Sequence, residues 1–246
     1  MHNGRRMWMW AAAGLTGAVI RAAAADAPAV TLDRLDELAS GLAEHPPGFP
    51  VAPVREQAFL DLDRFFESAV RPGQPFDLTR MPNELWQWID RRLLRTLDEV
   101  AAAPVDAEEL AVWQMYNMGL LCRSGKAIVG LDLIAVPGAA PEFRRRVAAQ
   151  VDVLLVTHAH PDHCDADLVQ ACLDAGKPVF LPAAAAAERA THPQLHGIEE
   201  NLEAEVAGVK ITARRGVHVW AGSRENPPIL YYEVTFPSGQ IGRAHV

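Results

Sequence analysis

The stretch VTHAHPDHCD, residues 156–165, contains three histidines and two aspartates, residue types that bind transition metals. His158 and His160 are two residues apart, so in an extended backbone their side chains point the same way and can share one ion. Asp162 and His163 are adjacent and can turn toward a second ion, for which a carboxylate and an imidazole form a workable partial shell. Neutral imidazole suits zinc, iron or manganese. The spacing therefore predicts a metal centre.

The residues before the motif favour a metal centre over an ordinary polar loop. VDVLLV, residues 151–156, is a continuous aliphatic run with the length of a buried strand. Loops that follow such strands commonly present catalytic groups, because a rigid sheet holds them. A lone HxH would usually be a polar loop, whereas four ligand-type residues at these offsets after an aliphatic strand are much more specific.

The series His158-x-His160-x-Asp162-His163 resembles the HxHxDH motif of the metallo-β-lactamase superfamily. The strand before the motif and ADLVQACLDAGKPVFLP after it are also similar to that family. The resemblance implies an αββα sandwich and a metal-dependent hydrolase that cleaves an ester, lactone, amide or phosphodiester bond. It further implies a centre of one or two divalent metal ions, with two expected and zinc preferred over manganese or iron.

The resemblance implies a third histidine for the first ion, taken from a later strand. RRGVHVWAG supplies His218 and is similar to the branch that includes ascorbate-phosphate lactonases and N-acyl-phosphatidylethanolamine phospholipases. His192 and His196, in THPQLHG, are the competing candidates, although their segment is typical of a solvated loop. GKAIVGLDL resembles the family's early strand that ends in an acid, which would place Asp132 beneath the metal loop as a support. An aspartate at a strand end is equally common as a turn or cap residue.

In a complete member of the family, a bridging aspartate in a short GD segment and a final histidine should follow. After the strand-like ILYYEVTF the chain reads PSGQ and then IGRAHV, residues 241–246, without either ligand. IGRAHV is the translation of DNA that resembles a widely used sequencing adapter. We therefore expect residues 241–246 to be an artefact and the gene to continue past Gln240. A genuine short C-terminus is the alternative. The chain as written is expected to be inactive.

By this resemblance, His158, His160 and His218 hold the first ion, and Asp162 and His163 hold the second. Asp162 would also be catalytic, because it would orient or deprotonate the nucleophilic water. The substrate class is a small or lipid-like molecule. Two alternatives stay open: a di-iron redox member of the same fold with a flavin domain, and a non-catalytic metal-binding fragment.

The elements that must position the motif follow from the periodicity of residues 106–240, where strands and helices alternate as in an α/β layered domain. We expect two β-rich runs joined by a turn at RSGK, followed by helices and strands in alternation. The runs are 109–122 and 127–136; the helices are 142–150, 165–176 and the alanine run 183–187; the strands are 151–156, 177–182, 209–220 and 229–236. This is the N-terminal half of an αββα sandwich. Its strand ending near Phe236 is expected to leave an open edge and an uncovered apolar face.

Residues 28–105 are predicted to form a helical extension with no chemistry of its own. Apolar residues recur at helical spacing in three stripes. The stripes are Leu32, Leu35, Leu38 and Leu42, after the capping residue Thr31; Phe59, Leu62, Phe66 and Val70; and Leu85, Ile89, Leu93, Leu97 and Val100. Trp86 and Trp88 are expected to pack in the core or an interface, with a substrate pocket as the alternative.

Residues 1–27 have the order of an export signal peptide: two arginines, an apolar run over 7–20, and small residues that offer a cleavage site at 23–25. The apolar run is shorter than the roughly 20 residues that an unstrained membrane span needs. We therefore expect an exported protein, periplasmic or secreted, without a stable membrane span. A misplaced start codon or an N-terminal helix on a cytoplasmic protein is the alternative.

Composition and charge limit the class of protein and the partners that the chain can have. The chain has 246 residues, of which 50% are apolar and 22% charged, as in an ordinary globular protein. Its formal net charge of −8, without a basic stripe, argues against a nucleic-acid partner. Three cysteines without a CxxC pair predict neither a disulfide framework nor a thiolate zinc site. The oligomeric state does not follow from the sequence.

Overall fold

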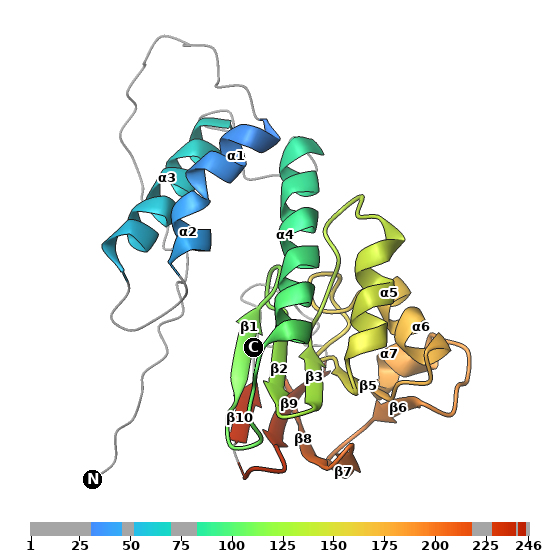
Figure 1. Cartoon of the computed structure of the whole chain (residues 1–246). Helices are drawn as coiled ribbons and strands as arrows, with labels where there is room; N and C mark the ends of the chain where they lie inside the picture. The colour runs from blue at the N-terminus through green and yellow to red at the C-terminus, as the bar shows by residue number, and fades with distance from the viewer. Residues whose placement is uncertain (1–30, 46–51, 70–82, 218–227, 240, 245–246) are drawn as a thin grey trace.

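The computed structural model describes residues 31–45, 52–69, 83–217, 228–239 and 241–244 (Figure 1). The predicted export signal, residues 1–27, lies outside these ranges. In the described residues, a helical segment leads into a layer of helices that covers one of two packed sheets. The fold class expected from the sequence, a partial α/β sandwich preceded by helices, is confirmed.

The helical segment begins where the sequence places it. Thr31 caps α1 (Leu32–Leu38) by accepting a hydrogen bond from the backbone N of Arg34 at 3.2 Å. The segment continues with α2 (Ser40–Glu44) and α3 (Pro53–Ala69). The stripe predicted on α3 is wrong at Phe59, which is 52% exposed and lies beneath the Arg55 guanidinium. The buried face is instead formed by Ala58, Leu62 and Phe65, because α3 packs on α1 through that side.

Helix α4 (Asn83–Ala102) joins the helical segment to the sheet layer because it has two apolar faces. Trp88 packs with Leu35 and Leu62, and its indole N–H donates to Asp36 Oδ1 at 2.8 Å. Trp86 faces the other way, into the core beneath the first sheet, together with the later apolar residues of the helix. The packing role predicted for both tryptophans is confirmed.

The first sheet has six strands in the order β1-β2-β3-β4-β5-β6. The strands are β1 (Ala111–Gln114), β2 (Leu120–Ser124), β3 (Ala127–Leu131), β4 (Val153–Leu155), β5 (Val179–Pro182) and β6 (Leu195–Ile198). The β-rich run 109–122 forms two strands rather than one, with a tight turn at 115–119. The hairpin predicted at RSGK joins β2 to β3, and Gly125 takes the positive φ of +56° that this turn requires. From β3 to β6 all pairings are parallel.

The parallel strands need crossovers, which α5 (Pro141–Gln150), α6 (Ala166–Asp174) and α7 (Ala183–Ala187) provide. With α4, the helices α5 and α6 cover one face of the sheet (Figure 1). Along β4 and β5 the side chains alternate between the two faces. Leu154 and Leu181 face the helices, whereas Leu155 and Phe180 face the second sheet.

The second sheet has the order β10-β9-β8-β7 and is antiparallel throughout. Its strands are β7 (Leu202–Val206), β8 (Val209–Val217), β9 (Pro228–Thr235) and β10 (Ile241–Ala244). Both long strands were expected, whereas β6, β7 and β10 were not. Ile211, Leu230 and Tyr232 point inward and form the core between the two sheets.

For the 246-residue chain, the prediction of an open edge and an uncovered apolar face near Phe236 is wrong, because residues 241–244 of the segment expected to be an artefact form the neighbouring strand β10. Strand β9, which ends at Thr235, is paired on both sides, with β8 and with β10. The outward side chains of the second sheet include the exposed residues Glu203, Glu205, Lys210 and Arg214. Polar residues at alternate positions make this face compatible with water, since strand side chains alternate strictly between faces.

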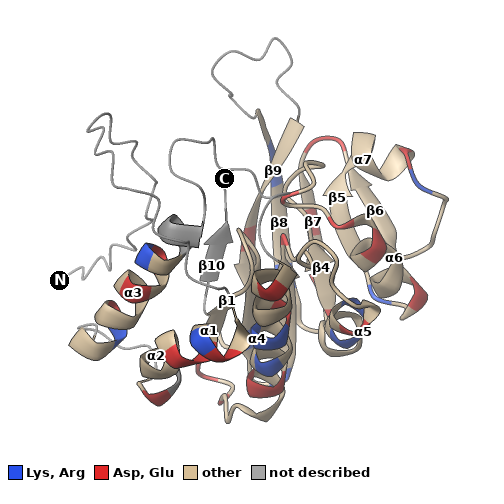
Figure 2. Cartoon of the chain, turned by 90° about the horizontal axis from the view of Figure 1, so that it is seen from above, with Lys and Arg blue, Asp and Glu red and all other residues tan. Residues whose placement is uncertain are grey.

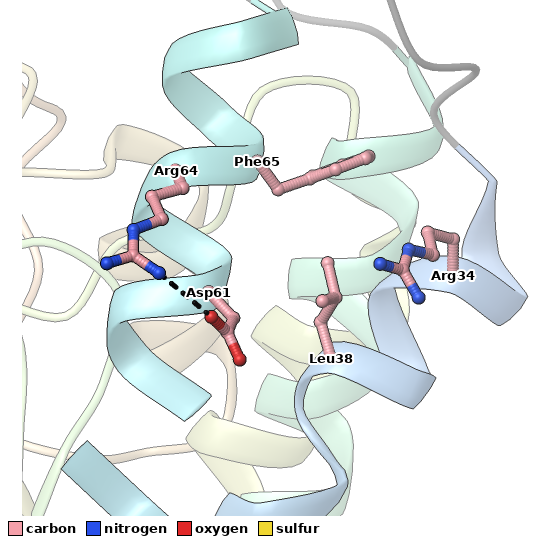
Figure 3. Close-up of a pocket in the computed structure, with 5 residues that line it drawn as sticks. All are labelled: Arg34, Leu38, Asp61, Arg64 and Phe65. Atoms are coloured by element: carbon pink, nitrogen blue, oxygen red, sulfur yellow. Dashed lines mark ion pairs between the residues drawn. The ribbon is translucent and has the colours of Figure 1, made fainter. Parts of the chain in front are cut away.

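Charges of both signs are interspersed along α1, α3 and α4 (Figure 2), in line with the absence of a basic stripe in the sequence. Within the described ranges, no helix has the length and apolar character to cross a bilayer. An open hollow of about 410 Å³ lies in the helical segment, lined by Arg34, Leu38, Asp61, Arg64 and Phe65 (Figure 3). It belongs to α1 and α3 and includes no residue of the histidine motif.

Candidate metal centre

The histidine motif directly follows the carboxyl end of β4, a central strand of the first sheet. From Thr157 the backbone passes through bends into a turn, in which the backbone N–H groups of His163 and Cys164 both donate to the carbonyl of His160 at 2.9 Å. Helix α6 begins immediately afterwards, with Asp165 as its N-cap. The motif is therefore fixed at one end by a buried strand and at the other by a capped helix.

Three donors of the motif converge. One ligand atom each from His158, Asp162 and His163 lies within 4.8 Å of the others. The two histidines are almost fully buried, at 1% and 3% exposure. The Asp162 side chain is 60% exposed. Two imidazoles and one carboxylate fit zinc, and also manganese or iron.

His160 lies beside this group rather than within it. Its ring centroid is 4.6 Å from that of His158, with the two rings nearly perpendicular. The convergent group thus combines His158 with Asp162 and His163, whereas the sequence assigned His158 and His160 to one ion and Asp162 and His163 to another. The division between two ions stays a prediction.

Asp132 lies beneath the metal loop, where the resemblance placed it. Its backbone takes a positive φ of +46° just after β3, and its carboxylate is 1% exposed. Oδ1 accepts the Thr157 backbone N–H at 2.7 Å, and Oδ2 accepts the Thr157 hydroxyl at 2.6 Å. Oδ2 also lies 2.8 Å from Nδ1 of His163. A residue other than glycine is uncommon in the left-handed region of backbone conformation, and the contacts of its carboxylate hold Asp132 there.

This network assigns the protons of both buried histidines. An ionised carboxylate only accepts, so His163 donates Nδ1–H to Asp132 and Thr157 donates its single hydroxyl proton to the same group. The Thr157 oxygen can then only accept from Nδ1 of His158, 3.1 Å away. Each imidazole therefore carries its proton on Nδ1 and its lone pair on Nε2, as a metal ligand requires.

Thr157 belongs to this hydrogen-bond network and was not among the residues that the sequence singled out. Its only sequence feature is its place between the aliphatic strand and the first histidine of the motif. A threonine there is unremarkable until the fold places Asp132 opposite it. The hydroxyl then connects the acid to His158.

The second sheet holds the start of the metal loop from the other side. The Tyr232 hydroxyl lies 3.1 Å from the carbonyls of both Val156, just after β4, and Phe180, within β5. The Leu230 N–H donates to the Thr157 carbonyl at 2.8 Å. Complete burial raises the pKa of Tyr232 well above 10.0, so the phenol remains a donor.

His218 lies outside the described residues. The strand that precedes it, β8, ends at Val217, which pairs with Pro228. Pro228 is two residues before Leu230, the residue bonded to Thr157. The register of β8 and β9 therefore brings the end of β8 to the same end of the sandwich as the motif.

The competing histidines do not join the donor group within the described part of the chain. His196 is not in a solvated loop, as the sequence suggested: it lies in β6 and stacks on the Phe180 ring, with centroids 4.6 Å apart. Burial lowers the pKa of His196, which favours the neutral ring. His192 accepts the Gln194 N–H through Nδ1 at 3.2 Å, within its own turn.

No protein-family model matches the chain, and neither does any curated protein sequence. Solved structures do match. A candidate metal-dependent hydrolase from Parabacteroides distasonis is 16% identical, with 52% of this chain and 56% of that chain covered and a TM-score of 0.41. MEM-A1, a subclass B3 metallo-β-lactamase from a soil metagenome library, is 13% identical, with 51% and 54% covered and a TM-score of 0.33.

A mutant of the CmlA β-hydroxylase is 13% identical, with 83% of this chain and 34% of that chain covered and a TM-score of 0.37. The chain thus spans little more than half the length of the hydrolase and the lactamase. It has two packed sheets, a helix layer on one of them and an HxHxDH motif after a central strand. The two packed sheets and the helix layer agree with the partial αββα sandwich that the resemblance implied.

Proposed function

We propose that the chain carries the metal-binding part of a metal-dependent hydrolase of the metallo-β-lactamase superfamily. The observation that carries the proposal is the buried pair His158 and His163. Both present Nε2 lone pairs beside the Asp162 carboxylate because Thr157 and Asp132 hold their Nδ1 protons. A histidine-rich surface turn would have no reason to bury two imidazoles on a carboxylate network.

A divalent ion held by these residues would act as a Lewis acid and would lower the pKa of a water molecule toward neutrality. His158 and His163 would bind it through Nε2. Zinc is the first choice for this donor set, with manganese or iron as alternatives. A second ion, with His160 and His218 among the ligands, is part of the proposal.

Asp162 is the donor placed to act on the substrate side. Its side chain is exposed while the two histidines are buried, so its carboxylate faces solvent as well as the donor group. One of its oxygens can accept a proton from the attacking water and orient that water's lone pair toward the substrate. The proposed bond classes are ester, lactone, amide and phosphodiester, in a small or lipid-like substrate.

The first test is metal binding by the 246-residue chain. Titration with Zn²⁺ in a calorimeter should give a saturable site, and His163→Ala or Asp162→Ala should weaken it at least about tenfold. His192→Ala is the matched control, because it removes an imidazole outside the donor group. A loss for His192→Ala as large as that for His163→Ala would place the site elsewhere.

Hydrolysis is tested on the protein purified from its own host, with generic ester, lactone and phosphodiester substrates. Metal analysis of protein purified from its own host, with a flavin absorbance scan, separates a zinc hydrolase from a di-iron redox protein. Iron with flavin and no hydrolysis would reject the proposed function.

A further inference from the structure

A tight turn between β1 and β2, residues 115–119, lies against the metal loop. The side-chain amide of Asn117 donates from Nδ2 to the backbone carbonyl of Asp162 at 2.8 Å. Asn117 has a φ of +57°, a conformation that asparagine adopts more readily than most residues. The two residues are 45 positions apart in the chain, so this contact exists only in the folded protein.

The turn is itself closely held. Its ends are joined by hydrogen bonds from Met115 N to Gly119 O at 2.8 Å and from Gly119 N to Tyr116 O at 3.2 Å. A Cβ on Gly119 would lie only 3.1 Å from the carbonyl oxygen of Asp132. The turn therefore packs against the residue that orients His163 and bonds to the residue that supplies the carboxylate.

Helix α4 contacts the turn through an aromatic pair. The Trp86 and Tyr116 rings meet edge to face, with centroids 6.0 Å apart. The pKa of Tyr116 is raised, first by burial and then by the charge of Asp162, as expected for a phenol close to that carboxylate. The helix that leads out of the N-terminal segment thus reaches the metal loop through one aromatic contact and one turn.

We propose that Asn117 is a positioning residue that holds the Asp162 carboxylate in the metal site, and that Trp86 and Tyr116 hold Asn117 in place. The inference rests on the proposed function, since it assigns Asp162 a role at the metal. Asp162 needs such an anchor because it is the exposed member of the donor group, in a turn between two histidines. The hydrogen bond to its carbonyl restricts the backbone of Asp162 before an ion binds. Ion binding therefore costs less conformational entropy.

The test is a double-mutant cycle on Zn²⁺ affinity, measured by competition with a chelating dye on the 246-residue chain. Asn117→Gly keeps the positive φ without strain and removes only the amide. It should weaken Zn²⁺ binding about tenfold. In an Asp162→Ala background the same change should cost less than about twofold, because no carboxylate remains to be positioned.

Met118→Ala is the control, since Met118 is in the same turn and is 53% exposed. It should leave the affinity unchanged. Equal losses from Asn117→Gly in both backgrounds would show a general effect on the fold and would overturn the inference while leaving the proposed function intact. No Zn²⁺ binding by the unaltered chain would overturn both.

Discussion

The carboxylate of Asp132 lies 2.8 Å from Nδ1 of His163, in a contact with both side chains at most 3% exposed. The pair joins the end of β3 to the metal loop that follows β4. Since Thr157 donates twice to the same carboxylate, Asp132 stabilises the loop and also fixes the tautomer of the histidine. One side chain therefore both supports the loop and orients a proposed metal ligand.

Asp132→Asn is expected to weaken Zn²⁺ binding by about 10- to 100-fold. Asparagine tolerates the positive φ, but its single oxygen cannot accept from Thr157 and His163 as two carboxylate oxygens do. His163 would then lose its fixed Nδ1 proton and with it the Nε2 lone pair. A chelator-competition titration checks this, with Asp174→Asn on α6 as control. Unchanged affinity in Asp132→Asn would disprove the tautomer assignment.

Tyr232→Phe should lower the free energy of unfolding by about 1–2 kcal/mol. The change keeps the ring in the core between the sheets but removes the donor near the Val156 and Phe180 carbonyls. Urea unfolding measures the loss. Tyr231→Phe, at an exposed neighbouring position, should change stability by less than about 0.5 kcal/mol. Equal losses for the two variants would show that the buried phenol has no special role.

Asp165→Ala should cost about 3 kcal/mol of stability. Asp165 caps α6 by accepting from the backbone N–H of Asp167 and Leu168, and it also pairs with Arg144 at 2.9 Å. The Ala135 backbone N–H also donates to Asp165 Oδ2 at 3.0 Å, so the removal of Asp165 leaves four donors without this acceptor. The matched control is Asp167→Ala, since Asp167 is 82% exposed and lies 3.8 Å from the same arginine. Chemical denaturation that shows equal effects for both variants would refute the role of the cap.

Stability should fall as the pH rises above about 9. Burial raises the pKa of Cys122 from 9.0 to about 11 and that of Cys172 to about 12. Between the unfolded and folded pKa values the folded state binds more protons, so the free energy of unfolding decreases with increasing pH. At pH 7 both thiols are protonated in either state, and this contribution to stability is fully present.

Thermal unfolding between pH 8 and pH 10.5 measures the decrease. Cys172→Ala removes one titrating group from a fully buried site, so its curve should be flatter than that of the parent. A parent chain whose melting temperature rises over this range, or a Cys172→Ala slope equal to the parent's, would contradict the prediction.

The sequence determined the donor types of the site and the main elements around them. The four ligand-type residues and the aliphatic run before them are close together in the sequence. The buried strand, the loop and the capped helix that they form therefore follow from local sequence alone. Thr157 was missed, because a threonine after a strand is unremarkable until the fold places Asp132 opposite it. The stripe on α3 failed at Phe59 because a helical period fixes the spacing of the buried side chains but not the direction of the packing partner.

Only the tertiary structure decided which of these residues act together. The contacts of His163 with Asp132, of Asp162 with Asn117 and of Val156 with Tyr232 join residues 31, 45 and 76 positions apart. Each depends on strand order and register, which bring chain segments together through pairings that no local period encodes. Hydrogen-bond direction then follows from the available donors and acceptors, and so the tautomers of His158 and His163 are fixed by the fold rather than by the motif.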